Sequence, residues 1–211
     1  MTENHLYILD TKTLDDQAVY DRWYKKMPAS RREKIDKYRF EKDKRLSLGA
    51  GILIQIGLTR AGADEISIRY GEHGKPYLAD NEDIFFNVSH SGTFSVCAVS
   101  CQPTGTDVEV IRKFDERLKS YVFNHPPQTD ADCTRLWTIK ESVMKYLGTG
   151  VSLGAKNIHV NMTEPITVTC DRYDTTGLYI SSYSIDDAFV SVASEFAKFA
   201  VPEYIDPTII I

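Results

Sequence analysis

The chain has 211 residues, of which 42% are apolar and 26% are charged. This composition predicts a globular protein with a substantial hydrophobic core and excludes a disordered, fibrous or collagen-like chain. Because 25 Lys and Arg residues stand against 30 Asp and Glu residues, the net charge of −5 argues against a general nucleic-acid-binding protein.

The sequence carries no signature of export, membrane insertion or cysteine-based metal binding. Residues 1–16 lack the basic start and apolar centre of a secretory signal. The longest apolar stretch, residues 50–58, is far shorter than the roughly 20 residues that cross a bilayer. The four cysteines form no CxxC pair, so we expect reduced thiols in a cytoplasmic protein with no membrane partner.

The first half of the chain alternates between strand patterns and two helical patterns. Pro28 ends the first helix, because proline disfavours a helical conformation in the residue before it, and Ser30 is the expected cap of the second helix. In chain order we expect a strand at residues 5–9, helices at 14–27 and 31–58, a strand at 65–70, a turn at 71–76, a strand at 84–88, a polar junction at 89–92 and a strand at 93–100.

The second half resembles the first in its order of elements. Gly148 closes its strongest helical pattern, as glycine commonly does after a last helical turn. In chain order we expect a strand at residues 106–110, a short helix or loop at 114–123, a helix at 134–147 and strands at 158–160, 166–170, 179–184 and 189–194.

Two segments, one in each half, resemble each other. Residues 89–100 and residues 182–194 both run from a Ser-containing strand through a polar turn into a small apolar strand. Chance similarity of two buried hairpins is the alternative explanation. We predict an α+β fold of two similar halves, residues 1–101 and 102–211, related by a pseudo-twofold axis. Each half is expected to be a small, mostly antiparallel sheet packed against a long helix.

Asp107 and Glu109 place two carboxylates on one face of a predicted strand, because residues i and i+2 point the same way. Two negative charges this close repel one another unless a cation lies between them. Mg²⁺ suits the pair, since it is commonly bound by one or two carboxylates together with substrate phosphate oxygens. The alternative is an ordinary solvent-facing strand edge.

Glu141 and Lys145 lie four residues apart and therefore share a helix face. In an isolated helix they would form an ordinary surface ion pair. Lys140 lies beside them, however, and the flanking Trp137 and Val143 indicate a helix that is buried on most sides. Charged residues at the rim of a buried helix favour a functional site.

Positive charge concentrates between Arg22 and Arg45, where eleven Lys or Arg residues stand against four Asp or Glu residues. A solvated helix face is the simpler interpretation. In a protein of net negative charge, the run also favours local recognition of an anion such as phosphate, an acidic protein or RNA. RNA is disfavoured because few aromatic residues are interleaved with the basic ones.

Residues 87–92, which include Ser89 and His90, form a polar segment at the end of a predicted strand. They offer hydroxyl groups, an imidazole and a glycine beside which backbone amides can approach a ligand. No G-x-S-x-G motif is present, so the segment gives little support to a serine-nucleophile enzyme.

Taken together, these segments resemble the 4′-phosphopantetheinyl transferase superfamily, in its two-half, monomeric surfactin-type branch. The most specific feature is G-x-D-x-E, followed after a gap by W-x-x-K-E-x-x-x-K. The resemblance spans about residues 30–160. The matching stretches are residues 74–77, 86–91, 105–109, 137–142 with Lys145, and 148–153.

The resemblance implies an enzyme whose active site lies at the interface of the two halves. Such enzymes transfer the phosphopantetheine arm of coenzyme A to a serine hydroxyl of an acyl or peptidyl carrier protein, and adenosine 3′,5′-bisphosphate leaves. The reaction depends on Mg²⁺, with Mn²⁺ as a substitute. The implied partners are coenzyme A and a carrier protein, without nucleic acid or membrane.

The resemblance also implies roles for individual residues. Glu141 would be the general base for the carrier serine, and Lys145 would contact the pyrophosphate of coenzyme A. The carboxylates that would bind the metal are Asp107, Glu109 and Glu141. The catalytic residues would be Asp107, Glu141 and Lys145. The residues that would bind coenzyme A are Arg31, Arg45, Lys75, Ser89, His90, Lys140 and Lys145.

Two positions depart from the family pattern. Thr106 stands where the family usually carries an apolar residue, and residues 123–128 lack the acid that the family usually has there. Two alternative functions remain open. One is a non-catalytic protein on the same fold that binds coenzyme A or a carrier. The other is a module that binds RNA or an acidic protein through the Arg22–Arg45 run.

Overall fold

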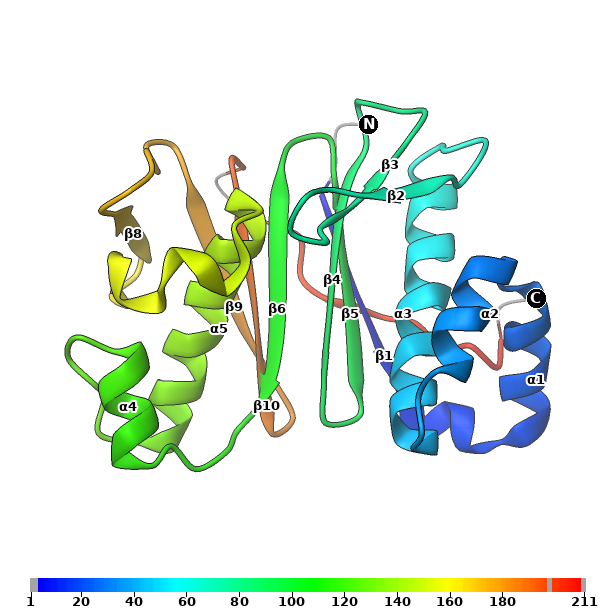
Figure 1. Cartoon of the computed structure of the whole chain (residues 1–211), viewed down its shortest axis with the longest axis horizontal. Helices are drawn as coiled ribbons and strands as arrows, with labels where there is room; N and C mark the ends of the chain where they lie inside the picture. The colour runs from blue at the N-terminus through cyan, green and yellow to red at the C-terminus, as the bar shows by residue number, and fades with distance from the viewer. Residues whose placement is uncertain (1–3, 197–198, 210–211) are drawn as a thin grey trace.

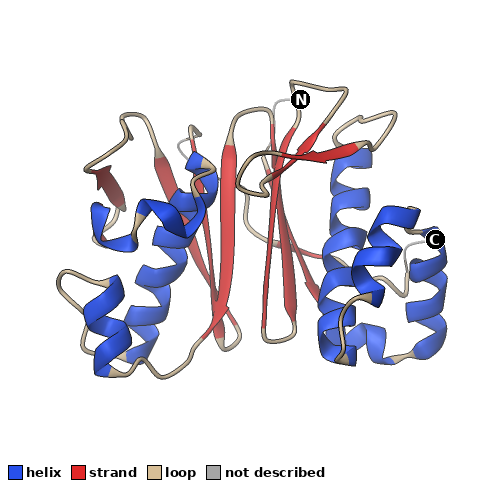
Figure 2. Cartoon of the chain, in the orientation of Figure 1, coloured by secondary structure: helices blue, strands red, loops and turns tan. Residues whose placement is uncertain are grey.

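The computed structural model describes residues 4–196 and 199–209. Strands occupy the centre of the molecule and helices flank them on both sides (Figures 1 and 2). One sheet has the strand order β11-β1-β5-β4, and a second sheet has the order β6-β10-β9. In the described residues no helix is both long enough and apolar enough to cross a membrane.

The N-terminal sheet is packed against a long helix, α3 (Glu41–Arg60). Its strands are β1 (His5–Asp10), β5 (Phe94–Ser100) and β4 (Phe85–Ser91), which are antiparallel, and the two-residue β11 (Glu203–Tyr204), which runs parallel to β1. The elements around it are η1 (Thr11–Asp15), α1 (Gln17–Lys26), α2 (Ala29–Asp36) and the small antiparallel pair β2 (Ile68–Tyr70) and β3 (Pro76–Leu78).

The C-terminal sheet is likewise packed against one long helix, α5 (Asp130–Leu147). Its antiparallel strands are β6 (Thr104–Val110), β10 (Ala188–Ser194) and β9 (Tyr179–Ile185). The remaining elements are α4 (Glu116–Val122), η2 (Gly150–Leu153), η3 (Ala155–Asn157) and the pair β7 (Ile158–Asn161) and β8 (Thr167–Cys170).

Apolar side chains on both faces of the strands explain why the two sheets lie between two helical layers. On β1, Leu6 and Ile8 belong to the cluster shared with β6, β9 and β10, whereas Tyr7 and Leu9 belong to the cluster under α3. Alternation along a strand sends these pairs to opposite faces. Strand β5 is buried along its whole length for the same reason. The apolar cluster between the sheets therefore joins the two halves.

The predicted α+β architecture of two similar halves is confirmed. Hairpin β4–β5 and hairpin β9–β10 hold corresponding places in the orders β1-β5-β4 and β6-β10-β9, which explains the sequence echo between residues 89–100 and 182–194. The boundary between residues 101 and 102 stays a prediction.

The predicted single helix at residues 31–58 is wrong, because α2 and α3 are separate. Between residues 36 and 45 only Tyr38 and Phe40 are apolar, so no continuous apolar stripe supports one straight helix. Ser30 is not the cap either, since the N-cap of α2 is Pro28. The predicted helix at residues 14–27 is also divided, because the Asp16 side chain accepts a hydrogen bond from the backbone of Ala18 and starts α1 there.

The predicted polar junction at residues 89–92 is part of strand β4 up to Ser91. The chain turns only at Gly92, which has a φ of 64°. A Cβ at this position would collide with the side chain of Val110 on β6, so glycine fits both the turn and the close approach. Ser89 and Ser91 are thus fixed by a strand ladder rather than carried by a loop.

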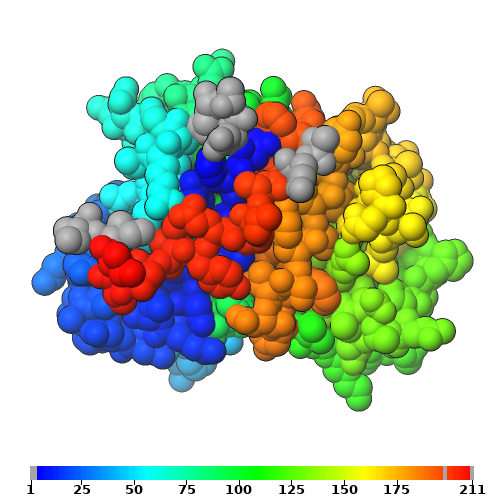
Figure 3. Space-filling model, turned by 180° about the vertical axis from the view of Figure 1, so that it is seen from behind, coloured from blue at the N-terminus to red at the C-terminus, as the bar shows by residue number. Residues whose placement is uncertain are grey.

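The sequence leaves the C-terminal segment at residues 205–211 unassigned, and the structure packs it onto the N-terminal half. Seen from behind, residues 199–209 run from the C-terminal half to the N-terminal half, where β11 pairs with β1 (Figure 3). The backbone N–H of Ile205, which is 5% exposed, donates to the Ile8 carbonyl at 2.7 Å. The Trp23 indole donates to the Pro207 carbonyl at 2.9 Å. Residues 210 and 211 lie outside the described residues.

Candidate active site

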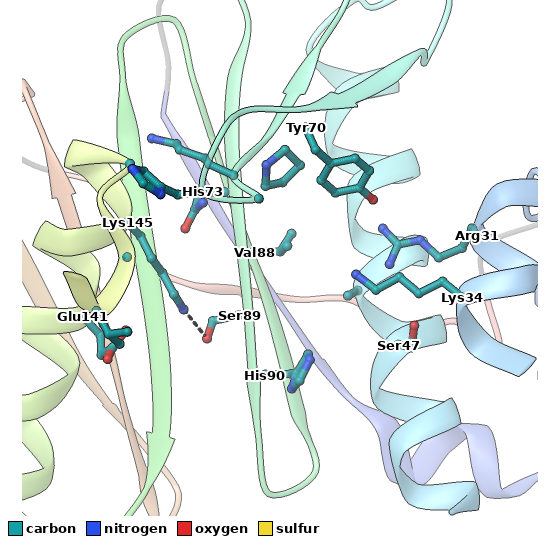
Figure 4. A pocket seen from close by; sticks show the side chains of 18 of the residues that line it. Arg31, Lys34, Ser47, Tyr70, His73, Val88, Ser89, His90, Glu141 and Lys145 are labelled. Carbon is teal, nitrogen blue, oxygen red and sulfur yellow. Dashed lines mark hydrogen bonds between the residues drawn. The ribbon is translucent and has the colours of Figure 1, made fainter. Parts of the chain in front are cut away.

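A cleft of about 400 Å³ opens between α2 and β4 of the N-terminal half and α5 of the C-terminal half. Figure 4 shows Arg31, Lys34 and Tyr70 on one side of it, Ser89 and His90 in the centre, and Glu141 and Lys145 on the other side. The predicted location of the site, at the interface of the two halves, agrees with this cleft.

Strands β4 and β6 belong to different sheets, and polar side chains connect them. Every second residue of β4 from position 87 to position 91 points toward β6. The contacts are Asn87 Oδ1 accepting from the Thr106 N–H at 2.9 Å, Ser89 Oγ donating to Asp107 Oδ1 at 2.7 Å, and Ser91 Oγ donating to Glu109 Oε2 at 3.0 Å. The two carboxylates predicted to share a strand face therefore face the neighbouring half of the protein.

Gly105 allows α5 to lie directly on β6. A Cβ at this position would collide with the backbone of α5, at the Ser142 carbonyl oxygen and at the Tyr146 nitrogen. The missing side chain brings the helix close enough for Lys145 to reach Asp107, two residues further along the strand. The glycine of the G-x-D-x-E motif is thus required for the approach of these two charged groups.

Asp107 lies at the centre of the site and is 4% exposed. Its Oδ1 accepts hydrogen bonds from Lys145 Nζ at 2.6 Å and from Ser89 Oγ at 2.7 Å, and Lys145 Nζ also donates to Ser89 Oγ at 2.8 Å. Its Oδ2 is buried and accepts no hydrogen bond in the described part of the chain. Buried polar atoms are normally satisfied, so this oxygen indicates a site for a further cationic or donor group.

Glu141 and Glu109 face the same centre and carry perturbed acidities. Burial, followed by the charge of Asp107, raises the pKa of Glu141 to about 7, against the opposing effect of Lys145. Burial and Asp107 also raise the pKa of Glu109, while the Ser91 hydroxyl opposes the rise. Three carboxylates and one lysine therefore form a cluster in which negative charge predominates.

The donor set fits Mg²⁺, although the carboxylates do not form a complete ligand shell. Within residues 4–196 and 199–209, no three His, Cys, Asp or Glu side chains lie close enough to bind a metal ion among themselves. Mg²⁺ commonly takes only one or two carboxylates and completes its shell with water and substrate phosphates. The unpartnered Asp107 Oδ2 and the neighbouring Glu109 and Glu141 provide such ligands.

Basic and imidazole groups line the opposite side of the cleft. Arg31 and Lys34 extend from α2, and burial lowers the pKa of each. Burial and the nearby Lys145 lower the pKa of His90. Cations that are partly removed from water favour an anionic ligand, which would restore the lost solvation. The cleft therefore has basic side chains that favour an anion on one side, and the carboxylate cluster lies at its other side.

Two residues predicted to bind coenzyme A lie outside the cleft. Lys140 is 3% exposed and donates to the carbonyls of Ala155 at 2.8 Å and Val122 at 3.3 Å, behind α5. Arg45 forms a 3.0 Å ion pair with Asp15. A role in binding coenzyme A does not fit Lys140, because a helix turns adjacent residues to different faces and Glu141 takes the cleft side.

Lys75 lines the cleft, but its ammonium group is engaged elsewhere. Lys75 Nζ donates to the Tyr146 carbonyl at 3.0 Å and to the Thr104 carbonyl at 3.1 Å. Burial lowers its pKa to about 8. Of the residues predicted to bind coenzyme A, the structure also brings Arg31, Ser89, His90 and Lys145 to the cleft, where Ser89 and Lys145 bond to each other and to Asp107.

Several residues that line the cleft are not among those predicted from the sequence. Lys34 lies one helical turn after Arg31, so the i,i+3 spacing within the basic run could have identified it. Ser47 lines the cleft from α3, is 3% exposed, and its hydroxyl oxygen has no hydrogen-bond partner among the residues that the structure describes. Tyr70 and His73 line the cleft because the β2–β3 hairpin folds over it, and no pattern in the sequence predicts that contact.

The two departures from the family pattern have local structural explanations. The buried Thr106 hydroxyl donates to the Ser191 carbonyl of β10 at 3.0 Å, so its polarity is satisfied under Asp107. In the segment 123–128, Phe123 is buried with α4, and the Asn124 side chain donates to the Lys156 carbonyl at 2.9 Å. Neither departure displaces the carboxylate cluster.

Two family models together cover most of the chain. The model for the 4′-phosphopantetheinyl transferase N-terminal region matches residues 16–102, and that for the 4′-phosphopantetheinyl transferase superfamily matches residues 103–193. The two models together span both halves of the fold.

Named relatives support the same assignment. A 4′-phosphopantetheinyl transferase of Bacillus subtilis is 30% identical over 183 residues, which cover 80% of this chain and 82% of the relative. The 4′-phosphopantetheinyl transferase Sfp of Bacillus subtilis (strain 168) is 27% identical, covering 82% of this chain and 84% of the relative. The 4′-phosphopantetheinyl transferase gsp of Aneurinibacillus migulanus is 29% identical, covering 72% and 69%. The chain therefore belongs to the 4′-phosphopantetheinyl transferase superfamily.

Proposed function

We propose that this protein transfers the 4′-phosphopantetheine arm of coenzyme A to a serine hydroxyl of an acyl or peptidyl carrier protein. The observation that carries this proposal is the cleft itself, in which Arg31, Lys34 and His90 lie across from Glu141 and Lys145, and Lys145 is paired with the buried Asp107. A ligand with one phosphate at one end and a pyrophosphate that would bind a metal ion further along matches both sides. The family membership supports the same reaction.

The chemistry is a displacement at phosphorus. The serine oxygen forms a bond to the β-phosphorus, the bond from that phosphorus to the bridging oxygen breaks, and adenosine 3′,5′-bisphosphate leaves with the electron pair. Catalysis of such a step consists mainly of positioning and charge stabilisation. Glu141 would accept the serine proton, since its carboxylate lies in the cleft beside Lys145.

Asp107, Glu109 and Glu141 would bind Mg²⁺, or Mn²⁺ in its place. When bound, the metal would supply positive charge to the pyrophosphate oxygens. Lys145 would donate to the same pyrophosphate, and Ser89 would keep the Lys145 ammonium oriented toward it. Arg31, Lys34 and His90 would bind the 3′-phosphate end of coenzyme A.

The decisive experiment is the intact mass of a purified apo-carrier protein after incubation with this protein, coenzyme A and Mg²⁺. A gain of one phosphopantetheine that EDTA suppresses is the expected result. If fatty-acid and peptidyl carriers gained no mass while coenzyme A still bound, the alternative of a non-catalytic binding protein would replace this proposal.

The chain is further proposed to act as a cytoplasmic monomer that needs neither nucleic acid nor a membrane. Its four cysteines, Cys97, Cys101, Cys133 and Cys170, are free thiols, as expected in a reducing compartment. Size-exclusion chromatography with light scattering tests the monomer, and a dimer mass would overturn that part of the proposal.

A further inference from the structure

Lys75 extends from the N-terminal half, and both hydrogen bonds that its ammonium group makes in the described part of the chain end on the C-terminal half. Its ammonium bridges the Thr104 carbonyl, at the start of β6, and the Tyr146 carbonyl, in the last turn of α5. The lysine stem runs past Gly148, where a Cβ would lie 3.8 Å from Lys75 Cδ. The side chain therefore crosses the interface.

The two carbonyls explain why a lysine is suited to this position. The last four carbonyls of a helix have no N–H partner within the helix, and the partial negative charge at this end favours a cation. Tyr146 belongs to that final turn of α5. Thr104 is the first residue of β6, so one ammonium satisfies the ends of two elements of the C-terminal half.

The elements that Lys75 connects carry groups of the cleft. Lys145 directly precedes Tyr146, and Asp107 lies three residues after Thr104 on β6. On the N-terminal side, His73 and Gly74 of the turn before β3 line the cleft. The geometry of this turn is fixed by the Gly71 N–H, which donates to the Lys75 carbonyl at 2.9 Å. Movement of the Lys75 side chain would therefore shift the segments on both sides of the cleft.

We propose that Lys75 is a positioning residue that ties the turn at residues 71–76 to α5 and β6, and not a ligand of a phosphate of coenzyme A. Its ammonium already binds two carbonyl oxygens and orders Lys145 through the last turn of α5. This inference rests on the proposed function in so far as the positioned cleft binds coenzyme A. The contact between the two halves is independent of that function.

Hydrogen–deuterium exchange of the full chain without coenzyme A tests the contact directly. In Lys75→Met, the amides of residues 71–75 and of the last turn of α5 are expected to exchange about tenfold faster than in the wild type, because both segments lose a hydrogen-bonded tie. Lys75→Arg, which retains cationic donors, is expected to restore part of the protection. Unchanged exchange in both segments would overturn the proposal.

Lys140 offers a matched control within the same chain. It is buried where Lys75 is half-buried, its pKa is also lowered to about 8, and it also donates to two carbonyls, those of Val122 and Ala155. Lys140→Met is expected to speed exchange near α4 and η3 while residues 71–75 keep their protection. Equal loosening of residues 71–75 in this control would show a general effect of removing a buried lysine, and would overturn the proposal.

Kinetics separates positioning from phosphate binding. For Lys75→Met, the fall in kcat/KM is expected to be the same for coenzyme A and for dephospho-coenzyme A, and it is expected to include a lower kcat at saturating substrate. A loss confined to coenzyme A would assign Lys75 to the 3′-phosphate and overturn the proposal. If the wild type transferred nothing, the proposed function would fail, while the exchange experiment would still decide the role of Lys75.

Discussion

At Glu141, a carboxylate without a hydrogen-bond donor in the described part of the chain faces Asp107 and Lys145. Glu141→Gln keeps the shape of the side chain and removes its charge. We expect transfer to fall by about 100-fold or more, because both metal binding and proton acceptance require the carboxylate. Intact-mass kinetics on an apo-carrier measures the rate.

The control for this variant is its thermal unfolding, followed by circular dichroism. The melting temperature is expected to be equal to or above that of the wild type, since the substitution removes a partly buried charge. Turnover close to that of the wild type would remove Glu141 from the mechanism.

His90 provides a second prediction at the residue scale. The imidazole lines the anion-binding side of the cleft beside Ser89. His90→Ala is expected to raise the KM for coenzyme A about tenfold, the effect of losing one hydrogen bond to a charged group. The KM for dephospho-coenzyme A, measured with the same carrier, is expected to change little. An equal change for both substrates would contradict the assignment to the 3′-phosphate.

At the scale of elements, the approach of α5 to β6 decides whether the charged groups meet. Gly105→Ala places a Cβ against the backbone of α5, which a flexible side chain cannot relieve. We expect a loss of about 1–3 kcal/mol of unfolding free energy and a large loss of transfer, because the helix that carries Glu141 must move. Urea denaturation and intact-mass kinetics measure the two effects.

Gly71→Ala is the matched control for the loss of stability. A Cβ at Gly71 would lie 3.7 Å from the nearest atom, an ordinary contact. Its unfolding free energy is expected to stay within about 0.5 kcal/mol of the wild type. If both alanine variants were equally stable, the close packing of α5 on β6 would not be the reason for glycine at position 105.

At the scale of the whole molecule, the C-terminal segment packs on the N-terminal half, where its strand β11 pairs with β1. Deleting residues 203–211 removes the buried Ile205, the Trp23–Pro207 hydrogen bond and the Arg60–Glu203 ion pair. We expect the unfolding free energy to fall by about 2–5 kcal/mol, mainly from the lost apolar burial. Urea denaturation of the truncated chain measures it, and a stability equal to that of the full chain would contradict a structural role.

The cluster between the sheets predicts that the two halves depend on each other. A fragment of residues 1–101 would expose Leu6, Ile8 and Val96 of this cluster to water, and would also lose Ile205 from the core under α3. We expect the fragment to be insoluble or unfolded. A soluble fragment with a cooperative unfolding transition would show that the N-terminal half is an independent domain.

Several predictions from sequence hold because they depend on local pattern. Strand β5 and helix α5 have strong apolar periodicity, and the structure contains both. The carboxylates of Asp107 and Glu109 share a strand face because alternation along a strand is fixed by the backbone. The break between α2 and α3 was missed, because helical propensity continues through the charged residues 37–45 while the burial pattern does not.

The sequence by itself determined the two-half α+β organisation, the family and the residues that form the carboxylate cluster. The order of elements follows from periodicity, whereas the family and the set of carboxylates follow from the resemblance of the motifs to a known family, and both depend on residues that are close in sequence. Only the tertiary structure decided which lysines reach the cleft. Lys140 and Glu141 are adjacent in the chain but lie on different sides of α5, and Lys75 reaches carbonyls 29 and 71 residues away. Such contacts depend on how whole elements pack, and no local pattern encodes them.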